Sequence, residues 1–233
     1  MKRSSINALI QDADAFFKQY HVFLPPFAYW TPSDWAAKGA EVEEIVDGQL
    51  GWDVTDYGLN DFMRYGLMLF TLRNGSPKSW ARGFNKHYAE KVVILELGQK
   101  HQMHYHWRKM EDIINRAGGV LCMELHNAAP DDNLDSSDVR VNMDGIWRTF
   151  PAGTVVQLKP GESISLTPRI YHRFWAEGQR VLMGEVSSVN DDYNDNCFYQ
   201  KMGTGRFSPI EEDDSPLYPL GNELERFWGG RKP

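Results

Sequence analysis

The segment GQKHQMHYHWRKMEDIINRAG, residues 98–118, holds three of the seven histidines of the chain. Side chains alternate between the two faces of a β-strand, so His104 and His106 share a face, about 7 Å apart along the strand. Both imidazoles can therefore reach one metal ion at about 2.1 Å per bond. The four residues before Glu111 leave room for a turn that returns its carboxylate beside them. His101 has the opposite parity, and we exclude it from the predicted ligand set.

The composition excludes several classes of protein. The chain of 233 residues is 42% apolar, which suits one domain of generous size. Lys+Arg 25 against Asp+Glu 32 gives a net charge of −7, which argues against nucleic acid or an anionic membrane as the main partner. No apolar run approaches the ~18 residues of a membrane span, and the N-terminus lacks an apolar signal-peptide core. Two cysteines are too few for a disulfide framework, so we expect a cytoplasmic protein in which Cys122 is a core residue.

Short apolar segments separated by turn residues predict antiparallel β-structure from about residue 64. The expected strands span residues 65–72, 90–97, 119–127, 139–143, 154–158, 163–166, 172–175 and 181–189. The expected turns are Asn74-Gly75, Asp144-Gly145, residues 159–162 and Glu177-Gly178. Strands at this spacing, without helices between them, indicate a sandwich or a barrel.

The N-terminal region has a different pattern. Apolar residues recur every three or four positions between Ile6 and Tyr20, which is typical of an amphipathic helix. Thr31-Pro32-Ser33-Asp34 offers a polar cap, a proline and an acidic first turn, and so predicts a second, short helix. We therefore predict one domain with three parts: a helical extension over 1–63, a β-barrel over 64–200 and an irregular C-terminal wrap over 201–233.

The spacing around the histidine pair resembles a known motif. Gly98, the two histidines, Glu111 and Gly118 reproduce the first motif of the cupin superfamily at its fixed spacing. The two glycines suit barrel corners, because such turns need backbone angles that glycine adopts cheaply. The resemblance implies an all-β fold, an antiparallel β-barrel or jelly roll, with the helical N-terminal extension as an appendage.

The second cupin motif, in which a glycine and a proline lead to another histidine, is similar to Gly161, Pro168 and His172. The match is imperfect. Ile170 stands where a glycine usually follows two residues after the proline, and the histidine arrives one residue early. The resemblance makes His172 the predicted fourth ligand, with an ordinary buried histidine as the alternative.

Three imidazoles and one carboxylate form a mixed nitrogen and oxygen site, which Mn²⁺, Fe²⁺, Co²⁺, Ni²⁺ and Zn²⁺ all accept. The cupin fold hosts dioxygenases, isomerases, decarboxylases and sensors, so further residues must narrow the function. Glu185 lies in an apolar strand, where an ionisable group needs a reason, and proton transfer is one. The acidic and amide-rich segment 190–196 is either a solvated turn or a set of groups that bind hydroxyls.

Two blocks sharpen the resemblance, which spans nearly the whole chain. HYHWRKMED (104–112) and GEVSSVNDDYNDN (184–196) are similar to the cupin-type bacterial D-lyxose isomerases. That resemblance implies a divalent metal, Mn²⁺ before Fe, Co, Ni or Zn, held by His104, His106, Glu111 and His172. It also implies a homodimer that interconverts D-lyxose and D-xylulose, and D-mannose and D-fructose less well. The sequence contains no Gly-rich phosphate loop and no paired-arginine motif, so we expect a free sugar as the substrate.

The chemistry of such a reaction assigns further roles. Aldose–ketose isomerisation through a cis-enediolate needs a Lewis acid and a group that moves a proton between neighbouring carbons. Glu185 is the predicted base, ideally with a pKa raised by burial, and Lys109 is predicted to stabilise or protonate a sugar oxygen. Asp192 and Asp195 are the predicted partners of distal hydroxyls. An iron-dependent cupin dioxygenase and a non-catalytic sugar-binding cupin stay open, and in the latter Glu185 would point away from the metal.

Overall fold

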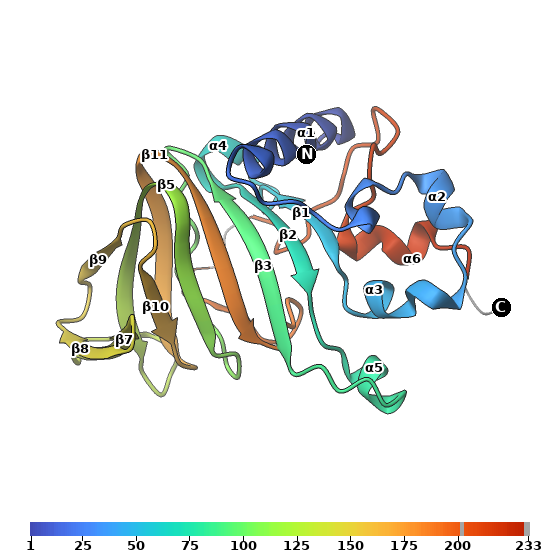
Figure 1. The fold of residues 1–233 in the computed structure, drawn as a ribbon. Coiled ribbons are helices and arrows are strands. Elements are labelled where there is room, and N and C mark those ends of the chain that lie inside the picture. Colours follow the sequence, from blue (N-terminus) through green and yellow to red (C-terminus); the bar gives the residue numbers. More distant parts are fainter. Residues whose placement is uncertain (201–202, 231–233) are drawn as a thin grey trace.

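The computed structural model describes residues 1–200 and 203–230, which form one large antiparallel sheet with helices beside it (Figure 1). The strands follow each other across the sheet as β1 (Gly51–Thr55), β2 (Leu67–Arg73), β3 (Tyr88–Leu95), β11 (Ile170–Ser188), β5 (Glu111–Ala128), β10 (Ser163–Leu166), β7 (Val139–Met143) and β8 (Ile146–Phe150). Four short strands pair beside this path, namely β4 (His104–Tyr105), β6 (Leu134–Asp135), β9 (Val155–Leu158) and β12 (Cys197–Phe198). The predicted antiparallel fold is confirmed. Within the described residues, however, β1 and β8 end the path at opposite edges, so the sheet is open.

The helices gather on the β1–β2 side of the sheet, away from the β7–β8 hairpin (Figure 1). They are α1 (Arg3–Gln19), η1 (Pro26–Tyr29), α2 (Pro32–Ala36), η2 (Ala40–Val42), α3 (Glu43–Asp47), α4 (Phe62–Tyr65), α5 (Pro77–Ala81), η3 (Gly221–Glu223) and α6 (Leu224–Phe227). The two predicted helices are α1 and α2, and Thr31 and Asp34 cap α2 reciprocally. In the part of the chain that the structure describes, no helix has the length and apolar character needed to cross a membrane.

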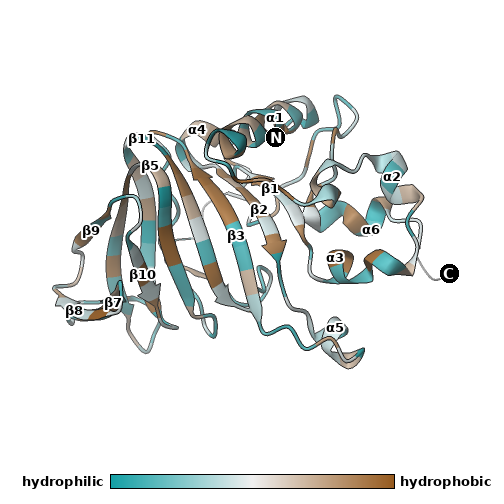
Figure 2. Cartoon of the chain, in the orientation of Figure 1, coloured by the Kyte–Doolittle hydropathy of each residue, from teal (hydrophilic) through white to brown (hydrophobic). Residues whose placement is uncertain are grey.

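Strands β2 and β3 are buried on both faces, and their side chains alternate between two cores. Met68 and Phe70 point to the outer face, where Ile6, Ile10 and Phe17 of α1 cover them. The residues between them along each strand, such as Leu69 in β2 and Val93 in β3, join the inner core instead. This double burial explains the uninterrupted apolar stretches at residues 67–70 of β2 and 92–95 of β3. Figure 2 shows apolar residues along β3 and β11.

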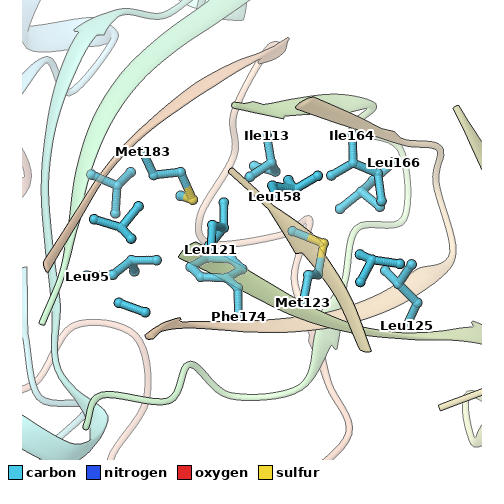
Figure 3. Close-up of a cluster of buried hydrophobic side chains, with 14 of the residues drawn as sticks. Leu95, Ile113, Leu121, Met123, Leu125, Leu158, Ile164, Leu166, Phe174 and Met183 are labelled. Atoms are coloured by element: carbon cyan, nitrogen blue, oxygen red, sulfur yellow. The ribbon is translucent and has the colours of Figure 1, made fainter. Parts of the chain in front are cut away.

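The inner core fills the space on the concave side of the sheet (Figure 3). Its side chains come from β2, β3, β5, β7, β9, β10 and β11 and include Leu95, Ile113, Leu121, Leu158, Ile164, Phe174 and Met183. All of these are less than a tenth exposed. The polar cavity described below opens beside this core, and Ile113, Phe174 and Met183 line both.

The predicted turn at Glu177-Gly178 is wrong, because residues 170–188 form the single strand β11. Its pairing with β5 is interrupted by a register shift between Glu177 and Val181, and Gly178 adopts a φ of 79° there. On β5, a Cβ at Gly119 would lie 2.3 Å from the carbonyl oxygen of Glu177. The close approach of two backbones lets both strands bend through a bulge instead of reversing. Inward-facing residues accordingly change from even positions (Phe174, Ala176) to odd ones (Val181, Met183).

One predicted boundary also moves. Strand β1 pairs with β2 over five residues, so the sheet begins inside the segment predicted as a helical extension. The indole Nε1 of Trp52 in this strand donates to the carbonyl of Ala28 at 2.7 Å, which ties the helical part to the sheet. Of the predicted C-terminal wrap, residues 203–230 are described and contain η3 and α6, whereas residues 201–202 and 231–233 lie outside the described residues. Arg3 at the start of α1 is fully buried and forms ion pairs with Glu212 and Glu223 of this wrap.

Candidate metal centre and active site

Three histidines meet where β4 pairs with β11. His172 of β11 and His104 of β4 are direct partners across the two strands. His106 follows β4 on the same face as His104, as the alternation of a strand requires. One ring nitrogen from each of the three lies within 4.8 Å of the other two. The structure thus brings together the three imidazoles predicted from the sequence.

Hydrogen bonds to the backbone fix the tautomer of each ring. The Nδ1 atoms of His104, His106 and His172 lie 2.8, 2.9 and 3.0 Å from the carbonyl oxygens of Gln102, Asp195 and Ile170. A carbonyl oxygen can only accept, so each Nδ1 carries the hydrogen and each Nε2 of the neutral ring presents a lone pair. Such a bond on the far side of a metal-binding histidine orients the ring and raises its donor strength. All three rings are therefore prepared to donate Nε2 to a cation.

Glu111, the first residue of β5, completes the group. Its Oε1 lies 3.1 Å from Nε2 of His172 and 3.5 Å from Nε2 of His106, yet this buried oxygen has no hydrogen-bond partner among the residues that the structure describes. Without a cation between them, the Nε2 lone pairs of His106 and His172 would be repelled by the negatively charged Oε1 of Glu111. A buried polar atom without a partner calls for such an explanation. The donors present therefore fit a divalent metal, and they match the four ligands predicted from the sequence.

The pKa values of these groups favour the metal-binding forms. Burial lowers the pKa of His106 to about 4 and that of His104 well below its usual value, so both rings are neutral at pH 7. Burial alone would raise the pKa of Glu111. The ammonium of Lys109 outweighs this effect and holds the pKa of Glu111 well below its usual value. Neutral imidazoles and an ionised carboxylate are the protonation states that a metal needs.

Glu185 faces the same cavity from the far end of β11. Lys109 Nζ lies 2.8 Å from Glu185 Oε1 and 2.8 Å from Glu111 Oε2, and so joins the predicted base to a predicted metal ligand. Lys91 Nζ approaches the same Glu185 oxygen at 3.3 Å. Burial would raise the pKa of Glu185, but Lys109 and Lys91 together lower it. The expectation of a raised pKa is therefore not met, because two ammonium groups surround the carboxylate.

The two predicted hydroxyl-binding aspartates differ in position. Asp192 lines the cavity, 3.8 Å from the guanidinium of Arg206, and its pKa is held well below the usual range because Lys91 and Arg206 outweigh the effect of burial. Asp195 lies outside the cavity lining. Its carboxylate accepts the backbone N–H groups of Arg108 and Lys109, each at 2.9 Å, and its carbonyl holds His106. Asp195 therefore shapes the loop that carries the metal ligands and Lys109, which differs from its predicted role.

Two charged residues of the cavity, Lys91 and Arg206, were not predicted from the sequence. Lys91 is buried in β3, and its signal is a charge in the middle of an apolar strand. Arg206 pairs with Asp53 and lies in the C-terminal segment, where no sequence pattern marks it.

His101 lines the cavity with its ring stacked on Phe174, 4.3 Å between centroids, and burial lowers its pKa to about 3. His101 is not one of the three histidines whose ring nitrogens converge, in agreement with its exclusion from the ligand set.

Sequence comparison assigns the chain to a family. A family model described as D-lyxose isomerase matches residues 1–224. The chain belongs to the D-lyxose isomerase family. The D-lyxose/D-mannose isomerase of Serratia proteamaculans is 50% identical over 232 residues, which cover 97% of this chain and 99% of that protein. The protein of the same name from Escherichia coli O157:H7 is 48% identical over 230 residues, which cover 97% of this chain and 100% of that protein.

Solved structures with the same fold include L-ribose isomerases. That of Cellulomonas parahominis with L-ribose superposes with a TM-score of 0.59 at 15% identity, over 91% of this chain and 98% of that one. That of Geodermatophilus obscurus gives a TM-score of 0.58 at 16% identity over the same shares of the two chains. At such identity the likeness shows the fold alone, which is cupin-like. The D-lyxose isomerase family member described here thus has the predicted fold class.

Proposed function

We propose that this member of the D-lyxose isomerase family is a metal-dependent aldose–ketose isomerase that interconverts D-lyxose and D-xylulose, and D-mannose and D-fructose less well. One observation carries the proposal: Glu185 faces the same cavity as the four convergent donors, and Lys109 joins its carboxylate to that of Glu111. Two relatives at about 50% identity, both named D-lyxose/D-mannose isomerase, support this substrate class.

The metal-binding role falls to His104, His106, Glu111 and His172. When bound there, a divalent ion supplies a Lewis acid that polarises the carbonyl and neighbouring hydroxyl of the sugar. We propose Mn²⁺ as the native ion, and the mixed donor set also accepts Fe²⁺, Co²⁺, Ni²⁺ and Zn²⁺. Metal analysis of the purified protein, followed by reconstitution of the metal-free form with each ion, would identify the ion that restores most activity.

Proton transfer falls to Glu185. Because Lys109 and Lys91 keep its carboxylate ionised, it can accept the hydrogen of C2 of the aldose as a proton and return it to C1. The proton of the C2 hydroxyl moves to the C1 oxygen in the same reaction, so aldose and ketose differ by no atom. Lys109, buried and positively charged, would stabilise negative charge that develops on the sugar oxygens.

The lining of the cavity suits a polyol. It combines hydrogen-bonding groups of both kinds, from Asp192, Arg206, Lys91 and Asn196, with the apolar ring of Phe198. Asp192 remains the proposed partner of a distal hydroxyl, with Arg206 beside it. We assign Asp195 no contact with the sugar, because backbone amides already occupy both of its carboxylate oxygens.

The test of the proposed function is ketose formation without oxygen. The Mn²⁺-loaded protein is incubated anaerobically with D-lyxose, D-mannose and a panel of other free aldoses, and ketose is measured. We expect D-xylulose from D-lyxose, loss of turnover with EDTA and recovery with Mn²⁺. A reaction that consumes oxygen would support the dioxygenase alternative, and binding of sugar without turnover would support the non-catalytic one. The position of Glu185 in the cavity already favours catalysis over binding alone.

We further propose that the protein acts in the cytoplasm as a homodimer. Both cysteines, Cys122 and Cys197, are free thiols, which agrees with a reducing compartment. Light scattering coupled to size-exclusion chromatography should give a mass twice the 26.8 kDa of one chain. A mass of one chain would contradict the dimer, and recovery in a secreted fraction would contradict the location.

A further inference from the structure

Arg169 stands at an unusual position of the backbone, just before the strand that carries His172. Its φ is 67°, in the left-handed region that strongly favours glycine. This backbone conformation costs an arginine free energy that it would not cost a glycine. The presence of an arginine here therefore suggests that its side chain has a role.

The backbone of Arg169 joins two segments that carry the proposed metal ligands. Its N–H donates to the carbonyl of His106 at 3.0 Å, and its own carbonyl accepts from Ala128 N, at the end of β5, at 2.9 Å. The next carbonyl, that of Ile170, holds Nδ1 of His172. The orientation of His172 and the position of His106 therefore depend on the same turn.

The side chain of Arg169 contacts the same segments. Its guanidinium lies over the ring of Tyr105, 5.1 Å from the centroid, and over that of Trp107 at 5.3 Å. Nη1 donates to the hydroxyl of Tyr105 at 3.2 Å, and Nη2 donates to the carbonyl of Ala129 at 2.7 Å and to Asp132 Oδ1 at 3.2 Å. Tyr105 and Trp107 flank His106 in the sequence, so the guanidinium holds the strand of the histidine pair against the loop after β5.

The hydroxyl of Tyr105 closes this arrangement. It donates to Asp132 Oδ1 at 2.6 Å, and the hydroxyl of Tyr171 donates to the carbonyl of Asp132 at 2.6 Å. Tyr105 and Tyr171 are fully buried, and each is the neighbour of a proposed metal ligand in the chain. One network thus connects the residues beside His104, His106 and His172 without touching the metal-binding atoms.

We propose that Arg169 is a positioning residue, whose side chain clamps the His104–His106 strand against the His172 strand and thereby sets the affinity of the metal site. The inference rests on the proposed metal site and adds a determinant outside the four ligands. Partners that orient metal ligands from the second layer alter metal affinity by about 10–100-fold when they are removed. The guanidinium does not contact the histidine rings directly. It acts on their positions through Tyr105, Trp107 and the loop that contains Asp132.

The test separates the side chain from the backbone. Arg169→Gly keeps the left-handed turn, which glycine adopts freely, and removes only the clamp. Metal-free wild type and variant are titrated with Mn²⁺ while the electron paramagnetic resonance of the free ion is recorded. We expect the Kd of Arg169→Gly for Mn²⁺ to rise about 10-fold or more, with a changed spectrum of the bound ion. The thermal unfolding midpoint in EDTA should change little, because the strained φ is relieved at the same time.

His21→Gly is the matched control, because His21 also has a positive φ, 58°, but is exposed at the end of α1. Its Kd for Mn²⁺ should equal that of wild type. A Kd of Arg169→Gly for Mn²⁺ within twofold of the wild-type value would refute the positioning role of Arg169. The proposed function would be unaffected by that result. Wild type that binds no Mn²⁺ would overturn the proposed metal site, and the clamp with it.

Arg169→Lys carries the test if Arg169→Gly does not fold. Lysine keeps the positive charge but cannot bridge Ala129, Asp132 and Tyr105 at once, because it lacks the planar fork of donors. We expect weakened Mn²⁺ binding in this variant too. Wild-type affinity in Arg169→Lys would show that charge alone suffices and would overturn the clamp.

Discussion

His104 and His172 lie directly opposite each other on the paired strands β4 and β11, each with its Nδ1 hydrogen bonded to a backbone carbonyl. The pairing turns two distant parts of the sequence into neighbours, and the hydrogen bonds leave both Nε2 lone pairs free. Strand β11 also carries Glu185, which would face away from His172 in a regular strand because thirteen positions separate them. The register shift after Glu177 reverses the alternation and brings both side chains to one cavity.

Replacement of Glu185 by glutamine should remove turnover and leave metal binding intact. The amide keeps the shape of the carboxylate but cannot accept the proton of C2. General acid–base groups contribute about 10²–10⁴-fold to rate, so kcat for D-lyxose should fall by that factor. Steady-state kinetics with the Mn²⁺ content measured in parallel would check this. Glu177→Gln, on an exposed part of the same strand, should keep wild-type kcat, and substantial residual turnover in Glu185→Gln would remove Glu185 from the role of base.

Replacement of Lys91 by methionine should move the pH profile. The Lys91 ammonium helps Lys109 to lower the pKa of Glu185, and without it that pKa rises. The base must be ionised, so the acidic limb of the kcat profile should shift to higher pH. Lys159→Met, on an exposed turn, should leave the profile unchanged. An acidic limb that stays in place or moves to lower pH in Lys91→Met would refute the electrostatic role of Lys91.

Much of the site could be predicted from sequence because its spacing is local. The histidine pair and Glu111 lie within eight residues, and strand alternation alone gives them a common face. The shared cavity of Glu185 and His172 could not be derived from spacing. Gly178 reads as a turn residue in the sequence, and only the close approach of Gly119 on the neighbouring strand turns it into a bulge. Arg206 was missed because its partner Asp53 lies far away in the sequence and no local pattern links the two.

The packing of α1 against the sheet should matter for stability. Ile10 is fully buried in the outer core beside Trp52 and Phe70. Replacement of such a residue by alanine leaves a cavity and costs about 2–5 kcal/mol. Urea unfolding of Ile10→Ala should show a loss in this range, and Ser5→Ala on the exposed face of the same helix should show almost none. A loss below about 1 kcal/mol in Ile10→Ala would mean that α1 is not docked as described.

The ion pairs of Arg3 should make the free energy of unfolding depend on pH in the acidic range. Hydrogen bonds from Arg3 and Arg226 lower the pKa of Glu212 to about 2, from an ordinary value of 4.5. Because the folded-state pKa is the lower one, this contribution is present above about pH 4.5 and is lost as the pH falls towards 2. Glu212→Gln should therefore destabilise the protein at pH 7 and flatten the fall in stability between those values. Chemical unfolding of wild type and Glu212→Gln between pH 2 and 7 would measure this difference. If the free energy of unfolding depends on pH in the same way in both proteins, the role of Glu212 is contradicted.

The central claim is that four side chains hold one divalent cation on which turnover depends. The most direct measurement is the number of Mn²⁺ ions retained per chain after dialysis, in wild type and in His172→Ala, with D-xylulose formation recorded on the same samples. We expect one ion per chain and activity in wild type, and neither in the variant. Turnover by metal-free wild type, or full Mn²⁺ retention without His172, would contradict the account.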